Sequence, residues 1–347
     1  MHKILQVFGK SRPIFPARQV AAAAIAVAAA MSGIAACGRH QSDDDGKLRV
    51  VTTVAPLTSI IASVGGDRIT VSGLVPEGTN SHTFEPPPSA SRLLAEADVI
   101  FINGLHLEDP IKKLAANTKR DDTDIVELGP EALPESEYIY DFSFPKKAGK
   151  PNPHLWTDPT YAIKYAEETR DRLIALDPAG TDGYRARTSA FVEKATALSD
   201  AIRADQQSLT AQERELLTYH DAYAYFARTY GWRVIGAVQP SDFEDPTPKE
   251  VAALIDQVRT EKVKAIFGSE VFPSRVLEQI GKATGARYVD VLRDDDLPGA
   301  VGSAEHSWLG LMRFDYQTII EALGGQAPKL RALDINQMEG PGAGFPQ

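Results

Sequence analysis

The sequence predicts an α/β fold in which two lobes, each built on a parallel sheet, are joined by a single long, rigid helix. Segments rich in β-branched residues alternate with helical segments at the spacing of βα units. A helical region from about residue 159 to residue 209 interrupts this alternation, which then resumes. The last helix of that region has apolar residues spaced for one helix face: Phe191, Ala195, Leu198 and Ile202.

The N-terminal segment is predicted to be an export signal. Four basic residues with no acidic residue precede the apolar run 20–31, and small residues then lead into Cys37. This pattern is typical of a secretory signal peptide, which we place at residues 1–36. Cys37 is the only cysteine, and its context resembles a bacterial lipobox, so we expect it to be lipidated. The alternative is an ordinary signal peptide cut near Ala36 that leaves a free thiol.

The charge of the chain limits its partners. Removing residues 1–36 takes away four positive charges, so the formal net charge of -10 becomes about -14. This acidity argues against nucleic acid or an anionic membrane surface and is compatible with a bound cation. No apolar segment of 18 residues follows Cys37, so membrane attachment is expected through lipid alone. We expect an exported, lipid-anchored protein of the cell envelope.

The first lobe is expected over residues 48–181, after a polar tether at 37–47. It begins with the strand-like run 48–54, and a helix follows over 56–64. Further strands are expected at 69–75 and 99–103, and further helices at 89–95 and from about residue 108.

The connecting helix is expected over 182–209 and the second lobe over 210–324. The second lobe repeats the strand-helix order, with strands at 215–219, 233–238, 265–269 and 287–289 and helices at 222–230, 248–260, 273–284 and about 306–323. The glycine-rich tail 325–347 is expected to be loose.

Three histidines occupy well-marked loops of this pattern. His82 and His220 each follow a strand, and His154 directly precedes a helix. Ligands of open α/β sheets bind beyond the carboxyl ends of strands, so these side chains are candidates for a metal site in the cleft between the lobes. Dispersed histidines alone are weak evidence, because most histidines have structural roles.

The residues around these histidines carry a more specific signal. The first loop reads Asn80-Ser81-His82-Thr83-Phe84-Glu85-Pro86, the second Pro153-His154-Leu155-Trp156-Thr157-Asp158-Pro159, and the third Thr218-Tyr219-His220-Asp221-Ala222. In this order the chain resembles the zinc- and manganese-binding solute-binding proteins of ABC importers, from about Leu48 to Leu323. The resemblance implies metal capture without catalysis, delivery to a membrane permease with its ATPase, and His82, His154 and His220 as ligands.

The resemblance also implies a carboxylate as the fourth ligand, in a segment of the Asp-x-Leu type. Asp290 in Asp290-Val291-Leu292 fits this pattern, and the run Asp294-Asp295-Asp296 is the competing choice. Glu270 is implied as a hydrogen-bond acceptor for a ligand imidazole. His106 is expected at the cleft rim, and His306 is expected to be exposed at the start of the last helix.

The identity of the metal is left open by these features. Three neutral imidazoles and one carboxylate favour zinc over manganese and iron. The loop before His154 contains Lys146-Lys147-Ala148-Gly149-Lys150 and no histidine, unlike many zinc-binding members, so manganese and iron stay open. Zinc is the preferred expectation, and manganese and iron are the alternatives.

Two other functions compete with metal transport. The first is a surface adhesin or structural lipoprotein with the same fold, and the second is a zinc hydrolase. The hydrolase is disfavoured because the chain has no His-Glu-x-x-His motif and four ligands would close the site. We expect a monomer whose connecting helix limits the lobes to small tilts.

Overall fold

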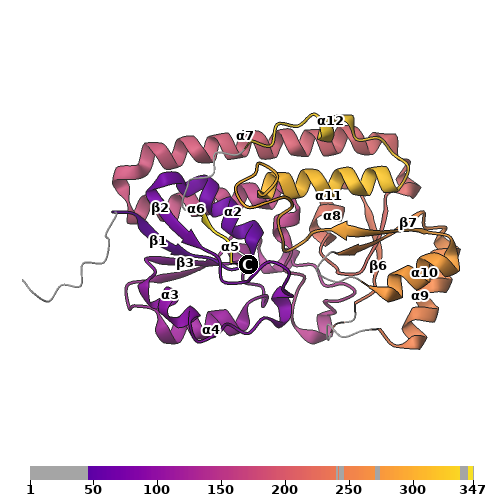
Figure 1. The fold of residues 1–347 in the computed structure, drawn as a ribbon, viewed down its shortest axis with the longest axis horizontal. Coiled ribbons are helices and arrows are strands. Elements are labelled where there is room, and N and C mark those ends of the chain that lie inside the picture. The colour runs from indigo at the N-terminus through magenta and orange to yellow at the C-terminus, as the bar shows by residue number, and fades with distance from the viewer. Residues whose placement is uncertain (1–45, 240, 242–245, 270–273, 337–342, 347) are drawn as a thin grey trace, which may run out of the picture. The chain divides into compact units, whose positions relative to one another are not determined.

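Two parallel sheets form the centres of the two lobes (Figure 1). The computed structural model describes residues 46–239, 241, 246–269, 274–336 and 343–346. The described residues from Gly46 onward form one compact unit. The α/β fold with two parallel-sheet lobes and a long helix, predicted from the sequence, is confirmed.

The sheet of the first lobe has the order β4-β3-β1-β2-β9. Its strands are β1 (Leu48–Val51), β2 (Ile69–Ser72), β3 (Val99–Ile102), β4 (Asp124–Glu127) and β9 (Ala343–Gly344). Val50 lies opposite Val71 on one side and Val99 on the other, and all three side chains are buried. Such β-branched runs fit strands that are covered on both faces.

Five helices accompany this sheet: α2 (Ala55–Gly65), α3 (Ala90–Glu96), α4 (Asp109–Thr118), α5 (Leu128–Ala132) and α6 (Pro159–Leu176). Helix α2 begins with a proline in its first turn, where no intrahelical N–H is needed. Every residue of α2 is buried, because the helix packs against both α6 and α7.

The sheet of the second lobe has the order β6-β5-β7-β8. Its strands are β5 (Glu215–Thr218), β6 (Arg233–Ala237), β7 (Ala265–Ser269) and β8 (Arg287–Leu292), and its helices are α8 (Ala224–Tyr230), α9 (Pro248–Glu261), α10 (Arg275–Thr284) and α11 (Trp308–Ala322). A capping box between Thr247 and Glu250 starts α9. Strand β8 is longer than the sequence pattern suggested, and it shows a register irregularity against β7.

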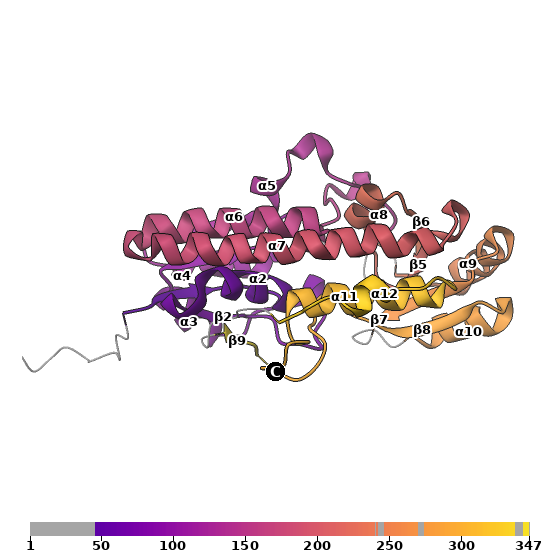
Figure 2. The ribbon, with the colours of Figure 1, turned by 90° about the horizontal axis from the view of Figure 1, so that it is seen from above.

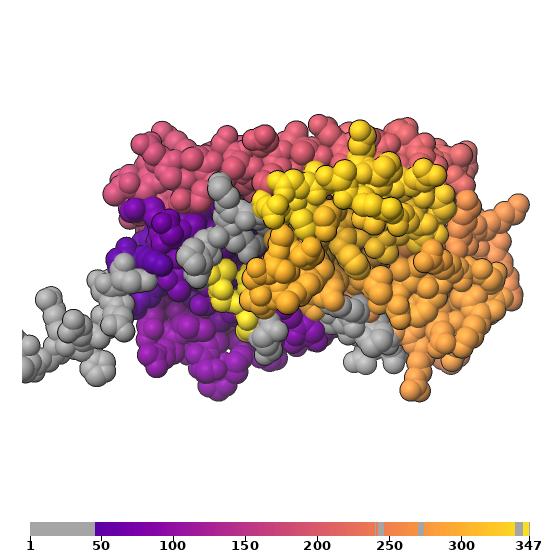
Figure 3. Space-filling view, turned by 45° about the horizontal axis from the view of Figure 1, so that its top comes forward, coloured from indigo at the N-terminus to yellow at the C-terminus, as the bar shows by residue number. Residues whose placement is uncertain are grey.

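Helix α7 (Thr181–Asp205) runs along both lobes (Figure 2). It packs against α2 and α6 in the first lobe and against α11 and the short α12 (Pro328–Arg331) in the second. Figure 3 shows the C-terminal helices lying along α7 on one face. The buried carboxylate of Asp205 accepts hydrogen bonds from the N–H groups of Lys329 and Leu330, which fixes the start of α12.

The described parts of the C-terminal tail are ordered against the fold, contrary to the expectation of a loose tail. Leu330 of α12 is fully buried, and β9 adds a parallel strand to the edge of the first sheet. The N–H of Gly73 donates to Gly344 O at 3.0 Å, and the N–H of Glu77 donates to Pro346 O at 3.1 Å. Two residues of strand carry no sequence periodicity, which is why the pattern did not reveal β9.

The two lobes share part of their hydrophobic core. The Trp308 indole N–H donates to Trp156 O at 2.9 Å, and the Trp156 indole N–H donates to Asp294 O at 2.9 Å. The Trp308 amide also donates to Ser59 Oγ of α2 at 2.8 Å. Because both indoles are fully buried, these bonds tie elements of the two lobes together at the base of the cleft.

Candidate metal centre

His82 comes from the first lobe. It lies in a short 3₁₀ turn, Ser81–Thr83, in the long loop after β2, and the Asn80 side chain caps this turn by accepting from the His82 N–H at 3.0 Å. The Ser81 hydroxyl donates to the Asp295 carboxylate of the other lobe. These contacts hold the N-terminal end of the turn, and the His82 residue stays partly exposed.

His154 comes from the loop that precedes α6 and is completely buried. Its Nδ1 lies 2.8 Å from Asn152 Oδ1, and its backbone N–H donates to the same oxygen at 3.1 Å. The Asn152 amide group donates in turn to Asp221 O at 2.7 Å. Because these bonds fix which end of the Asn152 amide is oxygen, His154 must carry its proton on Nδ1 and leave Nε2 as an acceptor.

His220 comes from the second lobe, two residues beyond the end of β5, and is 3 % exposed. Its Nδ1 lies 2.8 Å from Oε1 of Gln239, a buried residue just after β6. An amide oxygen can only accept a hydrogen bond, so Nδ1 of His220 also carries the proton and Nε2 presents a lone pair. His220 and His154 are thus prepared in the same tautomer.

The three imidazoles converge through their Nε2 atoms. The separation is 3.1 Å between His82 and His154, 3.1 Å between His82 and His220, and 2.9 Å between His154 and His220. Ligands about 2.0–2.1 Å from a tetrahedral zinc ion stand roughly 3.3 Å apart, close to this spacing. Converging lone pairs repel one another unless a cation lies between them, so the arrangement suits a metal ion.

Burial keeps two of these imidazoles, those of His82 and His154, neutral. It lowers the pKa of His82 and of His154 well below the usual range, and the neighbouring His220 adds to both shifts. A neutral imidazole is the form that binds a metal. Near pH 7 these two ligands therefore need not lose a proton before the ion binds.

Among the described residues, the carboxylate of Asp294 forms an ion-pair contact with the triad. Its Oδ2 lies 3.7 Å from His220 Nε2, and its side chain is 4 % exposed. Its Oδ1 accepts from the Asp295 N–H at 3.1 Å, which turns Oδ2 towards His220. The other two residues of the run face the first lobe, where Asp295 accepts from the Ser81 hydroxyl and Asp296 accepts from the Gly78 N–H.

Asp290, the residue expected as fourth ligand, does not join the histidines. It is exposed within β8, which continues to Leu292 instead of ending at Val289. Because the strand is longer, the first side chain that reaches the cleft comes four residues later, at Asp294. Asp294 therefore replaces Asp290 in the candidate ligand set.

The remaining expected site residues lie elsewhere. His106 is not part of the triad; its side chain is half exposed and its Nδ1 lies 3.2 Å from Asp109 Oδ2. His306 is 1 % exposed and not solvent-exposed as expected, because Phe345 of the tail packs edge-on against its ring. Glu270 and Cys37 lie outside the described residues.

Sequence reasoning missed Asn152 and Gln239, the two amides that orient the buried imidazoles. Asn152 lies two residues before His154, directly ahead of the second loop motif, so it could have been chosen as an orienting residue. Gln239 carries no such signal, because 19 residues separate it from His220 and only the pairing of β5 with β6 brings them together.

Comparison with known proteins finds a matching family and several similar metal-binding proteins. The model of the family described as zinc-uptake complex component A, periplasmic, matches residues 50–322. The iron-binding protein YfeA of Yersinia pestis is 29 % identical over 86 % of this chain and 94 % of its own length. The manganese ABC transporter substrate-binding lipoprotein PsaA of Streptococcus pneumoniae is 26 % identical over 88 % of this chain and 99 % of its own.

A solved structure is also similar to this chain over most of its length. The periplasmic zinc-binding protein TroA of Treponema pallidum superimposes with a TM-score of 0.72 at 26 % identity, and it covers 80 % of this chain and 99 % of its own. The similar proteins thus carry names that specify iron, manganese and zinc.

Proposed function

We propose that this chain captures one divalent transition-metal ion, preferably zinc, and delivers it to an ABC importer. The proposal rests on the family to which the chain belongs, that of the zinc-uptake complex component A, periplasmic. The family membership makes the chain a metal ABC transporter substrate-binding protein and not an enzyme. The proposed ligands are His82, His154, His220 and Asp294.

The convergence of three Nε2 atoms within about 3 Å of one another carries this proposal. Two of the imidazoles donate through Nδ1 to side-chain amides, so their Nε2 lone pairs point at one place. A structural histidine would normally turn such a lone pair towards a hydrogen-bond donor. The observation therefore supports metal binding better than a purely structural role.

The ligand set supports zinc as the preferred ion. Zinc favours four ligands in a tetrahedron, drawn from imidazole nitrogen, thiolate sulfur and carboxylate oxygen. Manganese favours more oxygen ligands in an octahedral arrangement, and three imidazoles with one carboxylate offer few. Four protein ligands also leave no open position for a catalytic water, which argues against the hydrolase alternative.

The partners follow from the role in transport. We infer a permease and an ATPase as partners of a monomeric protein that is held at the membrane by a lipid on Cys37. None of the helices in the described part of the chain is long and apolar enough to cross a membrane. The adhesin alternative needs no metal, so it would leave the orientation of the buried imidazoles without a purpose.

The proposed division of the chain keeps a signal peptide at 1–36, a tether at 37–47, a first lobe at 48–181, the connecting helix at 182–209 and a second lobe at 210–324. The packing of α7 on helices of both lobes supports its role as connector. The tail after residue 324 belongs with the folded unit in this proposal, because α12 and β9 pack on it.

Calorimetry on the metal-free protein tests this function. The chain from residue 38 onward is stripped of metal and titrated with Zn²⁺ and with Mn²⁺, beside His154→Ala and the control Asp290→Asn. We expect one site with a submicromolar Kd, tighter for zinc, lost in His154→Ala and kept in Asp290→Asn. Absence of binding by either metal would leave the adhesin alternative ahead, and tighter binding of manganese would overturn the zinc preference.

A further inference from the structure

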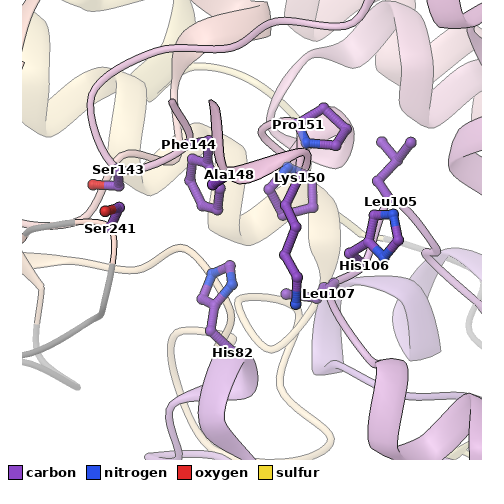
Figure 4. A pocket seen from close by; sticks show the side chains of 11 residues that line it. His82, Leu105, His106, Leu107, Ser143, Phe144, Ala148, Lys150, Pro151 and Ser241 are labelled. Carbon is purple, nitrogen blue, oxygen red and sulfur yellow. The ribbon is translucent and has the colours of Figure 1, made fainter. Parts of the chain in front are cut away.

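A pocket of about 60 Å³ opens onto His82, the one partly exposed imidazole of the triad (Figure 4). Its lining includes His82, His106, Phe144 and Lys150. The space beside His220 and Asp294, on the other side of the site, measures only about 10 Å³, roughly the room for one water. Among the described residues, the pocket at His82 is therefore the wider approach to the buried ligands.

His106 is held at this pocket by an unusual backbone. Gly104, Leu105 and His106 all have left-handed φ angles, of 77°, 54° and 68°. Two consecutive residues with a Cβ rarely adopt this conformation. The flanking Leu105 and Leu107 are buried, so the turn leaves the imidazole between them on the surface.

The buried carboxylate of Glu108 stabilises this turn. It accepts hydrogen bonds from the N–H groups of Asn103 at 2.8 Å and Gly104 at 3.0 Å, and from the Thr53 hydroxyl at 2.7 Å. The Leu107 N–H closes the turn on Gly104 O at 3.1 Å. The position of His106 is thus fixed by groups inside the first lobe.

The His106 imidazole is also oriented for a ligand. Its Nδ1 lies 3.2 Å from Asp109 Oδ2, so the carboxylate holds the ring proton there and leaves the Nε2 lone pair available. A carboxylate behind an imidazole is the arrangement that makes histidine a good metal ligand. Asp109 Oδ2 also receives the Lys150 ammonium at 3.4 Å, and Lys150 extends into the pocket between His82 and His106 (Figure 4).

We propose that His106, backed by Asp109, is an outer metal ligand at the pocket mouth that holds the incoming divalent ion briefly before it reaches His82. The inference rests on the proposed function and adds a second, weaker binding step to it. The Lys150 ammonium lies beside Asp109 and repels a cation at His106, so the outer site binds weakly and releases its cargo inward. The buried ligand set does not include His106, so the outer site changes rates and leaves the final affinity unchanged.

Stopped-flow mixing with Co²⁺ tests this step, using the absorption of the four-coordinate ion as the signal. In the wild-type chain we expect the observed loading rate to level off as the Co²⁺ concentration rises, because the outer site fills first. In His106→Asn we expect a linear dependence and loading about tenfold slower at low Co²⁺, the low end of local-concentration effects. Release should slow by the same factor, and the equilibrium Kd should not change.

The choice of variants separates this role from two others. Asparagine tolerates a left-handed backbone, so His106→Asn keeps the turn and removes only the imidazole. Asp109→Asn should slow loading less, because it removes the orienting carboxylate and keeps the ligand. If the pocket acts through charge alone, Lys150→Gln speeds loading and His106→Asn matches the wild type, which would overturn the proposal.

Failure of the outer site can also be distinguished from failure of the proposed function. If His106→Asn loads with the same rate and the same saturation as the wild type, the outer site does not exist although the buried site stands. If the wild-type chain binds no Co²⁺, Zn²⁺ or Mn²⁺ in calorimetry, the proposed function itself fails, and the outer ligand fails with it.

Discussion

At the scale of single residues, two side-chain amides decide which nitrogen the buried imidazoles present to the ion. Asn152 orients His154, and Gln239 orients His220. Asn152 stands two residues before His154, whereas Gln239 gives no signal of this role in the sequence. Their effect is nevertheless large, because an imidazole with its proton on Nε2 cannot bind a metal through that atom.

Replacing Gln239 by methionine should therefore weaken metal binding without removing a ligand. Methionine keeps the length of the side chain and removes the oxygen that accepts from His220 Nδ1. We expect affinity to fall about 10–100-fold, the usual effect of losing such a partner. Calorimetry against Gln207→Met, a change at an exposed glutamine of the same chain, measures the difference. Equal affinities in the two variants would show that Gln239 does not orient the ligand.

The fourth ligand is tested by exchanging single carboxylates for amides. Asp294→Asn removes the buried charge 3.7 Å from His220 Nε2 and should weaken zinc binding at least about tenfold, or about 1.4 kcal/mol. Asp290→Asn alters an exposed residue of β8 and should leave the Kd within error. The reverse pattern would restore Asp290 as the ligand and contradict the geometry of the β8 end.

The pH dependence of stability includes a contribution from Glu168, away from the metal centre. Burial, with the nearby Glu131 carboxylate, raises the pKa of Glu168 to about 8, and its Oε2 has no hydrogen-bond partner among the described residues. An unfolded glutamate ionises near pH 4.3. Between about pH 4.3 and pH 8 the unfolded state therefore loses this proton first, so stability falls as the pH rises through that window.

Glu168→Gln should remove this loss. We expect the variant to match the wild type near pH 4.5 and to exceed it by about 1–2 kcal/mol above pH 8, a figure reduced for the partial exposure of the side chain. Urea unfolding at several pH values measures the gap, with Glu167→Gln at the exposed neighbour as control. A gap that does not widen with pH would show that Glu168 is ionised in the native protein.

At the scale of elements, the sequence predicted the long regular segments well and the short or irregular ones poorly. The strands around Val50 and Phe267 are apolar runs that only a buried sheet accommodates, so their type and order followed from the pattern. The end of β8 did not follow from the pattern, because Asp290 and Val291 continue the strand after its apolar alternation has stopped. The position of the fourth ligand depended on that detail.

The C-terminal strand is the other element that the pattern hid, and its removal should be measurable. Deleting the chain from Ala343 onward breaks the bonds from Gly73 N–H and Glu77 N–H to the tail and uncovers His306. We expect a loss of about 2–3 kcal/mol in the free energy of unfolding, at roughly 1 kcal/mol for each backbone bond with a further part from Phe345. Urea unfolding checks this value, and Phe345→Ala should lose only the part due to the ring. Unchanged stability would mean that β9 does not pair in solution.

At the scale of the whole folded unit, α7 and the shared core limit how the lobes can move. The sequence indicated the helix but not the second restraint, which is the chain of buried bonds from Ser59 through Trp308 and Trp156 to Asp294. These bonds join residues far apart in the sequence, so no local pattern could reveal them. One end of this chain lies at the proposed ligand Asp294, which couples the metal to the lobe interface.

Spin labels on the two lobes should therefore report only a small change on metal binding. The chain from residue 38 onward contains no cysteine, so Lys113→Cys on α4 and Lys282→Cys on α10 can be labelled at two exposed positions without background. We expect the label–label distance to shift by no more than about 2 Å between the metal-free and the zinc-bound protein, as in transitions that tilt helices without bending a hinge. A control pair within the first lobe, Lys113→Cys with Arg92→Cys, sets the experimental scatter. A shift several times larger would mean that α7 bends or that the bonds around Trp308 break during capture. Release would then proceed by opening of the lobes.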